Sequence, residues 1–275
     1  MKKILLIQPL LLQENLPPLS LMYLASILEN KRFKVKIIDM NTEKDYTRKI
    51  ITYVKKERPA FVGFSVIIGL QILFAKFISK KIKKINPLTK IVWGGPFPSS
   101  VPETIIINEY VDVVVVGEGE LTFLELATNI EKNNLKKVKG IVFKDGENII
   151  KTKPRNIIDM NILPTPSWHL INIHKYAKCD IFLNVTRGCP YNCEFCFIPT
   201  IGKLRGKSAK KIIEEINILL TKYAIRNINF SCEGFLFDRE RINKLTYLIK
   251  KNNLNFEWES WMNLSYILRG FVPRV

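Results

Sequence analysis

Residues 186–196 read Thr186-Arg187-Gly188-Cys189-Pro190-Tyr191-Asn192-Cys193-Glu194-Phe195-Cys196. This run places three cysteines within eight residues, with the spacing C-x₃-C-x₂-C, and it follows the apolar segment 181–185. Iron–sulfur clusters are normally held by four cysteine thiolates. Three thiolates leave one iron open, as a catalytic metal keeps an open position. The spacing therefore predicts an open iron–sulfur site on Cys189, Cys193 and Cys196, at a strand's carboxyl end, where (β/α) barrels carry their chemistry.

A structural zinc site is the alternative interpretation of the same cysteines. Such a site needs four protein ligands. Cys179 and Cys232 lie ten residues upstream and thirty-six residues downstream of the run, and His169 and His174 both precede it. Under this alternative we expect one tightly bound zinc and no iron after anaerobic purification.

The spacing, the lead-in 186–190 and the aromatic Phe195 before the third cysteine resemble the radical S-adenosylmethionine (SAM) enzymes. The resemblance implies a [4Fe-4S] cluster on the three cysteines, with SAM at the open iron. One electron from a donor such as flavodoxin or ferredoxin would cleave SAM to methionine and a 5′-deoxyadenosyl radical. Phe195 would lie near the adenine of SAM. The alternative interpretation is that Phe195 is an aromatic side chain packed in the core under the loop.

A second stretch, Ser231-Cys232-Glu233-Gly234-Phe235, stands where this family contacts the SAM amino group, often with Gly-Gly-Glu. The resemblance implies Glu233 and Gly234 as cofactor-binding residues. A solvated loop carboxylate is the alternative interpretation of Glu233.

Composition limits the class of protein. The chain has 275 residues, of which 47% are hydrophobic, enough for two domains with separate cores. Five cysteines, three of them in one loop, favour a reducing cytoplasm over a secreted disulfide framework. No stretch approaches the roughly 20 apolar residues that span a bilayer. We therefore expect a soluble cytoplasmic protein.

The formal charge is +18, from 43 Lys and Arg against 25 Asp and Glu. The lysines recur through 31–36, 76–84, 132–139 and 203–211, on predicted helix faces and turns, and form no single stripe. A basic balance alone raises only non-specific affinity, so a nucleic-acid partner is not favoured. A tRNA-modifying methylthiotransferase is a further alternative, but such proteins carry an N-terminal cysteine cluster and this chain has no cysteine before Cys179.

The first 130 residues alternate between short apolar runs and segments with helical periodicity. The runs are continuously hydrophobic, as strands buried on both faces of a parallel sheet are. Their alternation with helices indicates a doubly wound α/β fold, and five strands suit a flavodoxin-like order. The predicted strands are Lys3–Ile7, Val35–Ile38, Ala60–Ser65, Lys90–Trp93 and Val111–Val116, and the predicted helices are Leu19–Asn30, Asp45–Glu57, Leu70–Ile85, Pro102–Asn108 and Leu121–Lys132.

Glycine-rich segments follow several of these strands. In doubly wound sheets, ligands bind beyond the carboxyl ends of the strands, and glycine lets the backbone approach them. No G-x-G-x-x-G follows the first strand and no G-x₄-G-K-[ST] occurs, so a nicotinamide or nucleoside-triphosphate ligand is not favoured. The pattern instead favours a large cofactor, with plain turns as the alternative. The candidate binding residues are Ser65, Gly94, Gly95, Pro96, Gly117, Glu118 and Gly119.

This N-terminal region resembles the cobalamin-binding domain that precedes the radical SAM core in one large class. The matching stretches are 17–21, 62–65, 94–99 and 113–120. The Asp-x-His-x-x-Gly loop of cobalamin mutases is absent, because no histidine precedes His169. The resemblance therefore implies bound cobalamin in its base-off form, with no histidine on cobalt.

A hairpin (140–144 and 148–151), a linker with three prolines (152–167) and a second domain are predicted to follow. The second domain has predicted strands Ile181–Thr186, Asn227–Phe230 and Phe256–Trp261 and helices Ala209–Lys222, N-capped by Ser208, and Arg239–Lys251. The predicted division is 1–135, a cobalamin-binding-like domain; 136–175, hairpin and linker; and 176–275, the N-terminal half of a radical SAM core.

The second domain is short for this family. Eight-unit barrels use about 250 residues, so a six-unit partial barrel needs roughly 190, whereas residues 181–275 supply about three units. We therefore expect a truncated or frameshifted product, or a barrel that another chain completes. The resemblance implies methylation of an unknown small molecule, with ring formation or rearrangement as other reactions of the class. The competing interpretation is a catalytically inactive fragment that acts at most as a cobalamin-binding module.

Overall fold

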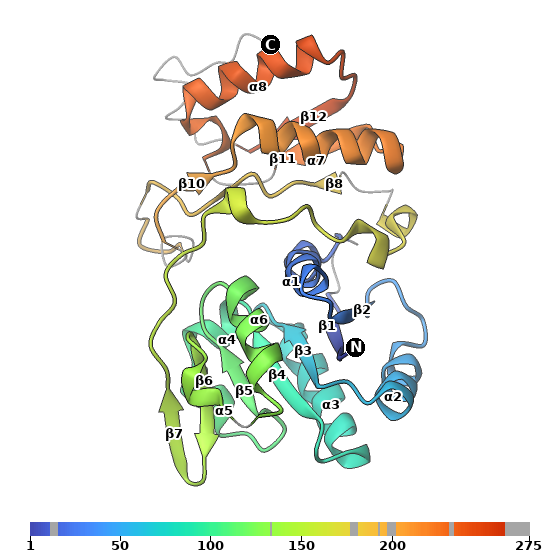
Figure 1. Ribbon diagram of the computed structural model, residues 1–275, viewed down its shortest axis with the longest axis vertical. Helices are drawn as coiled ribbons and strands as arrows, with labels where there is room; N and C mark the ends of the chain where they lie inside the picture. The colour runs from blue at the N-terminus through green and yellow to red at the C-terminus, as the bar shows by residue number, and fades with distance from the viewer. Residues whose placement is uncertain are drawn as a thin grey trace. The chain divides into compact units, whose positions relative to one another are not determined.

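The computed structural model describes residues 1–11, 16–132, 134–176, 181–191, 193–196, 202–230 and 234–261. The chain divides into two compact units, which are described separately (Figure 1). The first unit comprises Met1–Asn156 and Pro166–Asn172, and the second comprises Ile157–Thr165 and Ile173–Val275.

The first unit is built on a seven-stranded sheet with the order β2-β1-β3-β4-β5-β6-β7. Strands β1 to β5 pair in parallel, which confirms the predicted doubly wound fold and the flavodoxin-like order. The predicted hairpin also forms, and it extends the same sheet, because β6 pairs antiparallel with β5 and β7 with β6. The strands are β1 (Lys3–Gln8), β2 (Lys34–Asp39), β3 (Phe61–Ser65), β4 (Lys90–Gly94), β5 (Val113–Val115), β6 (Ile141–Asp145) and β7 (Asn148–Lys151).

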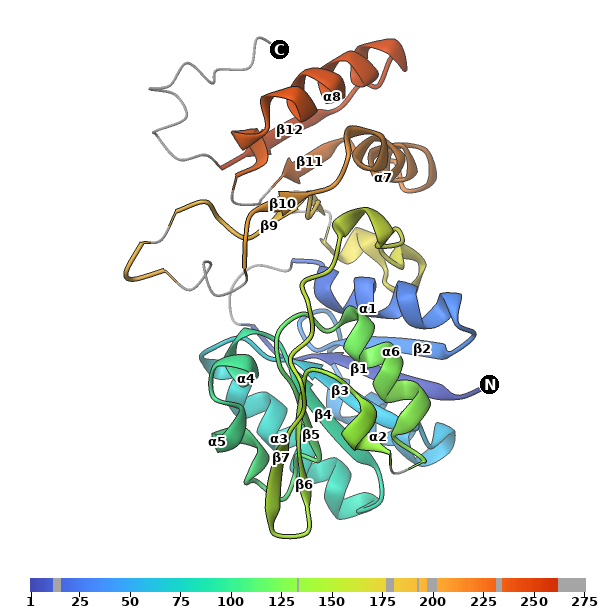
Figure 2. The same cartoon turned by 60° about the vertical axis from the view of Figure 1, so that its left-hand side comes forward.

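Helices cover both faces of this sheet (Figure 2). Helices α1 and α6 pack against each other, as do α2 and α3. The side chains of β1 point alternately to the two faces of the sheet. Leu5 and Ile7 belong to the hydrophobic cluster that includes residues of α2 and α3, while Ile4 and Leu6 are buried on the other face. The helices are α1 (Leu19–Asn30), α2 (Tyr46–Glu57), α3 (Leu70–Ile85), α4 (Pro96–Ser100), α5 (Pro102–Ile106) and α6 (Glu120–Asn129), with 3₁₀ turns η1 (Leu135–Lys137) and η3 (Trp168–Leu170).

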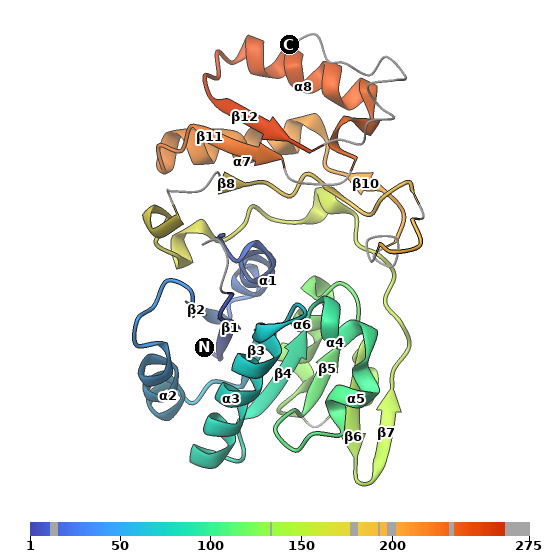
Figure 3. The ribbon, with the colours of Figure 1, turned by 180° about the vertical axis from the view of Figure 1, so that it is seen from behind.

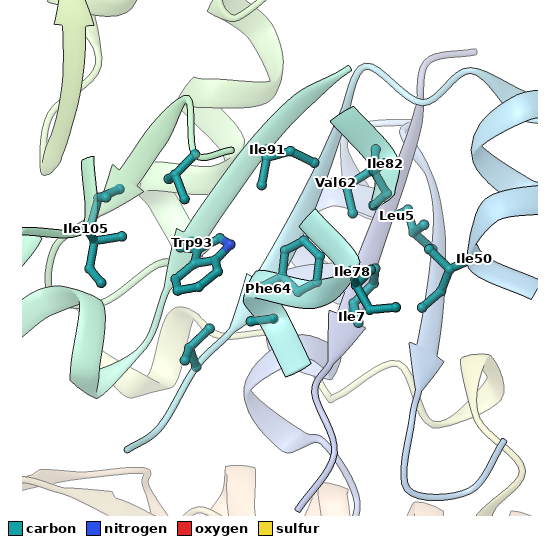
Figure 4. Packing of buried hydrophobic residues seen from close by; sticks show 14 of the residues in the cluster. Leu5, Ile7, Ile50, Val62, Phe64, Ile78, Ile82, Ile91, Trp93 and Ile105 are labelled. Carbon is teal, nitrogen blue, oxygen red and sulfur yellow. The ribbon is translucent and has the colours of Figure 1, made fainter. Parts of the chain in front are cut away.

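The core of this unit is centred on Trp93 of β4. Its indole lies beside Phe64, between Ile105 and Ile78 (Figure 4), with the Phe64 and Trp93 ring centroids 6.3 Å apart. The buried indole Nε1 donates a hydrogen bond of 3.0 Å to Ser79 Oγ, so this large side chain leaves no unsatisfied donor. Each fully buried aliphatic or aromatic side chain contributes about 1.5–3 kcal/mol.

The second unit contains a parallel sheet with the order β12-β11-β8 and a small antiparallel pair, β9 and β10 (Figure 3). Helix α8 joins β11 to β12, and α7 precedes β11, which gives the strand–helix repeat of a partial (β/α) barrel. Both helices begin at side-chain caps, because Ser208 Oγ accepts from Lys211 N and Asp238 Oδ1 accepts from Arg241 N. The elements are η2 (Met160–Ile162), η4 (Ile173–Tyr176), β8 (Ile181–Phe182), β9 (Thr186–Arg187), β10 (Arg205–Gly206), α7 (Ala209–Lys222), β11 (Asn227–Phe230), η6 (Phe235–Phe237), α8 (Arg239–Lys251) and β12 (Glu257–Ser260).

The structure departs from the predicted elements at the strand 181–186 and at helix α4. The predicted strand 181–186 is divided, because β8 pairs in parallel with β11 while β9 pairs antiparallel with β10. Helix α4, with the sequence Pro-Phe-Pro-Ser-Ser, was not among the predicted elements. Pro96 occupies its first turn, where the missing N–H costs no helical hydrogen bond.

Candidate cofactor sites

The structure brings the glycine-rich segments of the first unit together at the carboxyl edge of its sheet. Ser65 and Gly94 are register partners at the ends of β3 and β4, and Val66 N donates to Gly94 O over 2.8 Å. Gly95 has φ +104°, and a Cβ there would lie 2.8 Å from Val66 O. Only glycine fits this close approach of two loops, so the position is fixed by backbone packing as well as by the left-handed φ.

The loops after β4 and β5 are joined by Ser99, a residue that was not predicted as part of the site. Its hydroxyl donates to Gly95 O over 2.8 Å and accepts from Gly117 N over 3.0 Å. Gly117 has φ +79° with open space where a Cβ would point, and Gly119 directly precedes α6. Ser99 therefore holds two of the predicted cofactor-binding loops in one arrangement.

A second connection at this edge comes from Gln71 on α3. Its side chain is fully buried; Oε1 accepts from Ile67 N over 2.7 Å and Nε2 donates to Pro9 O over 3.0 Å. Gln71 thus links the loops that follow β1 and β3. Nothing in the sequence distinguishes this glutamine from a solvent-exposed helix residue.

The exposed surface beside this edge is apolar. Four hydrophobic side chains of the β3–α3 loop and the first turns of α3 are exposed, while Pro96 is exposed and Glu118 is half-buried in the neighbouring loops. Apolar side chains exposed together mark ligand-binding or interaction surfaces. The four are Ile67, Ile68, Leu70 and Leu73.

In the second unit, the cysteine loop is closed at its base by the β9–β10 pair. Arg205 pairs with Arg187 and Gly206 with Thr186, so the two ends of the loop lie on adjacent strands. Gly188 has φ +78°, and a Cβ there would lie 2.4 Å from Gly202 O. The glycine before the first cysteine is therefore required by the geometry of the loop.

The three cysteines have free thiols, with Cys193 exposed and Cys189 and Cys196 half-buried. A hydrogen bond of 3.0 Å from Cys196 N to Cys193 O forms the turn between the last two. Within the described residues, no group of three or more His, Cys, Asp or Glu side chains is close enough to hold a metal ion. The fit to a cluster therefore rests on the donor set: three free thiols on one short loop, which suits iron or zinc far better than calcium or magnesium.

The other predicted SAM-binding residues have mixed outcomes. Phe195 is 94% exposed, which excludes the core-aromatic alternative and leaves the adenine contact as a prediction. Glu233 lies outside the described residues. Gly234 is buried, and its backbone is left-handed (φ +81°). A Cβ there would lie 2.9 Å from Leu204 Cδ1, so packing and backbone conformation already explain the glycine at this position.

A buried ion pair lies directly after the cysteine loop. Lys207 is 1% exposed and Glu215 is fully buried, and Lys207 Nζ donates to both carboxylate oxygens over 2.7 and 2.6 Å. Burial lowers the pKa of Lys207, and the adjacent carboxylate opposes this shift. The basic run 203–211 therefore includes a buried lysine, which the charge pattern of the sequence did not indicate. The backbone N of Lys207 also donates to Val185 O over 2.9 Å, which connects the pair to the strand segment before the cysteines.

Comparison with known proteins places these features in a family. The B12 binding domain family matches residues 12–127. An uncharacterized methyltransferase of Pyrococcus horikoshii is 35% identical over 88% of this chain and 54% of its own length. The chain spans about half the length of the curated relatives it matches.

Two solved structures share the fold. The cobalamin-dependent SAM radical enzyme OxsB, with aqua-cobalamin and SAM bound, has a TM-score of 0.79 at 23% identity, covering 94% of this chain and 38% of that one. The radical SAM methyltransferase TsrM from Kitasatospora setae, with cobalamin and a [4Fe-4S] cluster bound, has a TM-score of 0.74 at 18% identity, covering 93% and 52%.

The fold is thus that of a B12-binding α/β domain followed by part of a radical SAM barrel. The resemblance predicted from the sequence is confirmed: residues 12–127 match the B12 binding domain family, and the chain shares its fold with cobalamin-dependent radical SAM enzymes. In the described part of the chain, no helix combines the length and apolar character needed to cross a membrane.

Proposed function

We propose that this chain is part of a cobalamin-dependent radical SAM methyltransferase that acts on a small molecule. Cys189, Cys193 and Cys196 would hold a [4Fe-4S] cluster and leave one iron for SAM. The observation that carries the proposal is the loop of three free thiols, closed at its base by β9 and β10 and placed at the carboxyl side of a (β/α) sheet. When bound, the cluster supplies the electron that cleaves SAM.

Residues at the carboxyl edge of the first sheet would hold cobalamin. Gly117 leaves open space beside the loop after β5, Gly95 lets the loop after β4 approach Val66 closely, and Ser99 holds the two loops together. The exposed apolar side chains that begin at Ile67 suit the face of a corrin ring. When bound, cobalamin supplies a cobalt centre that carries a methyl group. We propose the base-off form with no histidine on cobalt, because the first histidine in the sequence is His169.

The reaction class rests on the relatives. The Pyrococcus horikoshii relative bears the name of a methyltransferase, and so does TsrM. Ring formation or rearrangement is the second candidate reaction, and a non-catalytic cobalamin-binding module is the second candidate function. The proposed partners are a small-molecule substrate and a one-electron donor such as flavodoxin or ferredoxin.

Anaerobic reconstitution followed by metal and cobalamin analysis tests the proposal. We expect about four irons and four sulfides per chain, and a cobalamin spectrum without an imidazole ligand. Substitution Cys193→Ala should abolish iron loading while cobalamin binding persists, because the two cofactors use separate residues. One tightly bound zinc and no iron, or a spectrum of imidazole-ligated cobalt, would contradict the proposal.

A further inference from the structure

The two faces of the first sheet carry helices of opposite charge. Helices α2 and α3 cover one face and pack against each other (Figure 1). Helix α2 contains four Lys or Arg residues and α3 contains five, against a single acid, Glu57. Helices α1 and α6, on the other face, contain no Lys or Arg, and they carry one and two glutamates. The fold therefore gathers on one side lysines that form no single stripe along the sequence.

The outer side of α2 and α3 exposes most of these cations. Lys83 is half-buried and pairs with Asp112 over 2.7 Å, and Lys49 pairs with Glu43. Exposed like charges on adjacent helices sum to a positive potential, which attracts an anionic partner. We term this surface the basic face; it is formed by the exposed side chains of Lys55, Lys56, Lys76, Lys80, Lys81 and Lys84.

Two exposed apolar side chains accompany these lysines. Phe77 is 47% exposed, and Leu88, in the turn after α3, is 86% exposed. Phe77, Lys81 and Lys84 share one side of α3 because they are four and three residues apart, and Lys81 Nζ lies 4.9 Å from the Phe77 ring centroid. Leu and Phe beside lysines are typical of surfaces that rest in a lipid headgroup layer, where apolar groups enter and ammonium groups stay at the phosphates.

The basic face is distinct from the edge that carries the candidate cofactor residues. Helix α3 joins the end of β3 to the start of β4, and these two strands are parallel. The helix therefore begins at the carboxyl edge of the sheet and ends at the amino edge. The exposed apolar side chains of residues 67–73 lie at its beginning, whereas Phe77 and Leu88 follow toward the amino edge. The proposed function thus leaves the basic face without a ligand.

We propose that the basic face binds the surface of a membrane that contains anionic phospholipids. This inference is independent of the proposed function. Nucleic acid is also a polyanion, but contacts with its phosphates need only charge and would leave Phe77 and Leu88 in water. A headgroup layer accepts both kinds of side chain, because its anionic phosphates attract the lysines and its acyl boundary takes up the apolar groups.

Co-sedimentation of the full chain with lipid vesicles tests the proposal, with phosphatidylcholine vesicles and phosphatidylcholine–phosphatidylglycerol vesicles as probes. We expect the wild-type protein to partition at least about a hundredfold more strongly onto the vesicles with phosphatidylglycerol, and this preference should fall as salt is added. Each lysine near an anionic surface contributes about fivefold to partitioning. The variant Lys80→Gln/Lys81→Gln/Lys84→Gln should therefore partition about a hundredfold more weakly.

A matched control separates the basic face from the net charge of the chain. The variant Lys132→Gln/Lys137→Gln/Lys139→Gln also removes three exposed lysines, but these follow α6 on the other side of the sheet. It should partition like the wild-type protein. Equal losses in the two lysine variants, or equal partitioning of the wild-type protein onto both kinds of vesicle, would overturn the proposal.

Leu88→Gln tests the apolar contact separately. This side chain is 86% exposed, so its substitution spares the core, and we expect about tenfold weaker partitioning onto the anionic vesicles. Ile149→Gln, at an exposed position of β7, is the control and should partition normally. A loss in the α3 lysine variant without any loss in Leu88→Gln would indicate a purely electrostatic surface, such as one for nucleic acid, and would overturn the assignment to lipid.

Discussion

Breaking the buried Lys207–Glu215 pair should destabilise the second unit. Lys207→Met removes the ammonium group that lies 2.7 and 2.6 Å from the two Glu215 oxygens and leaves a carboxylate enclosed in the core. Removing one member of a buried ion pair costs about 3–5 kcal/mol. At 1.36 kcal/mol for each factor of ten, amides of α7 should exchange hydrogen between about 160 and about 5,000 times faster.

Hydrogen-exchange mass spectrometry resolves this effect by segment. Peptides from α3 in the first unit are the internal control and should keep their exchange rate. The double variant Lys207→Met/Glu215→Leu should recover most of the lost protection, because an apolar pair of similar volume often replaces a buried ion pair without loss. Unchanged exchange in α7 of Lys207→Met, or a double variant as labile as the single one, would refute this reasoning.

Two further predictions concern the loops of the cofactor sites. Gly188→Ala should reduce iron loading and destabilise the cysteine loop by about 1–3 kcal/mol, because the backbone at Gly188 is left-handed and the added Cβ meets a carbonyl oxygen. Gly146→Ala is the control for strain alone, since Gly146 lies at a left-handed turn with open space around it. Equal iron loading in the two variants would contradict the contact argument. Ser99→Ala should weaken cobalamin binding about tenfold in a spectroscopic titration, since it removes the hydrogen bond that holds the Gly117 loop. Ser100→Ala is the control and should bind cobalamin normally, because the Ser100 hydroxyl donates to Phe97 O within its own helix. Equal affinities of the two variants for cobalamin would exclude the role of Ser99.

The fold of the first unit was predictable because its signals are local. Continuous apolar runs mark buried parallel strands, and the periodicity of α1 and α3 gave their bounds without error. The edge at which the hairpin pairs was not predictable, because an amphipathic hairpin carries no information about its neighbour. Its addition to β5 follows from the three-dimensional arrangement alone.

The candidate sites were predictable only where residue type and spacing carry the chemistry. The C-x₃-C-x₂-C run predicts its cluster ligands by residue type and spacing, and Gly95 marks a close backbone approach. Ser99 and Gln71 were missed, because each acts through partners distant in sequence. The burial of Lys207 was not predicted, since a lysine in a basic run gives no local sign that a glutamate eight residues on is buried with it.

Electron paramagnetic resonance of the anaerobically reconstituted, reduced protein, with and without SAM, tests the central claim most directly. We predict a [4Fe-4S]⁺ signal that SAM perturbs and that Cys193→Ala abolishes, whereas Cys179→Ala, outside the motif, retains it. No cluster signal, or a signal that SAM leaves unchanged, would contradict an open iron site on this loop.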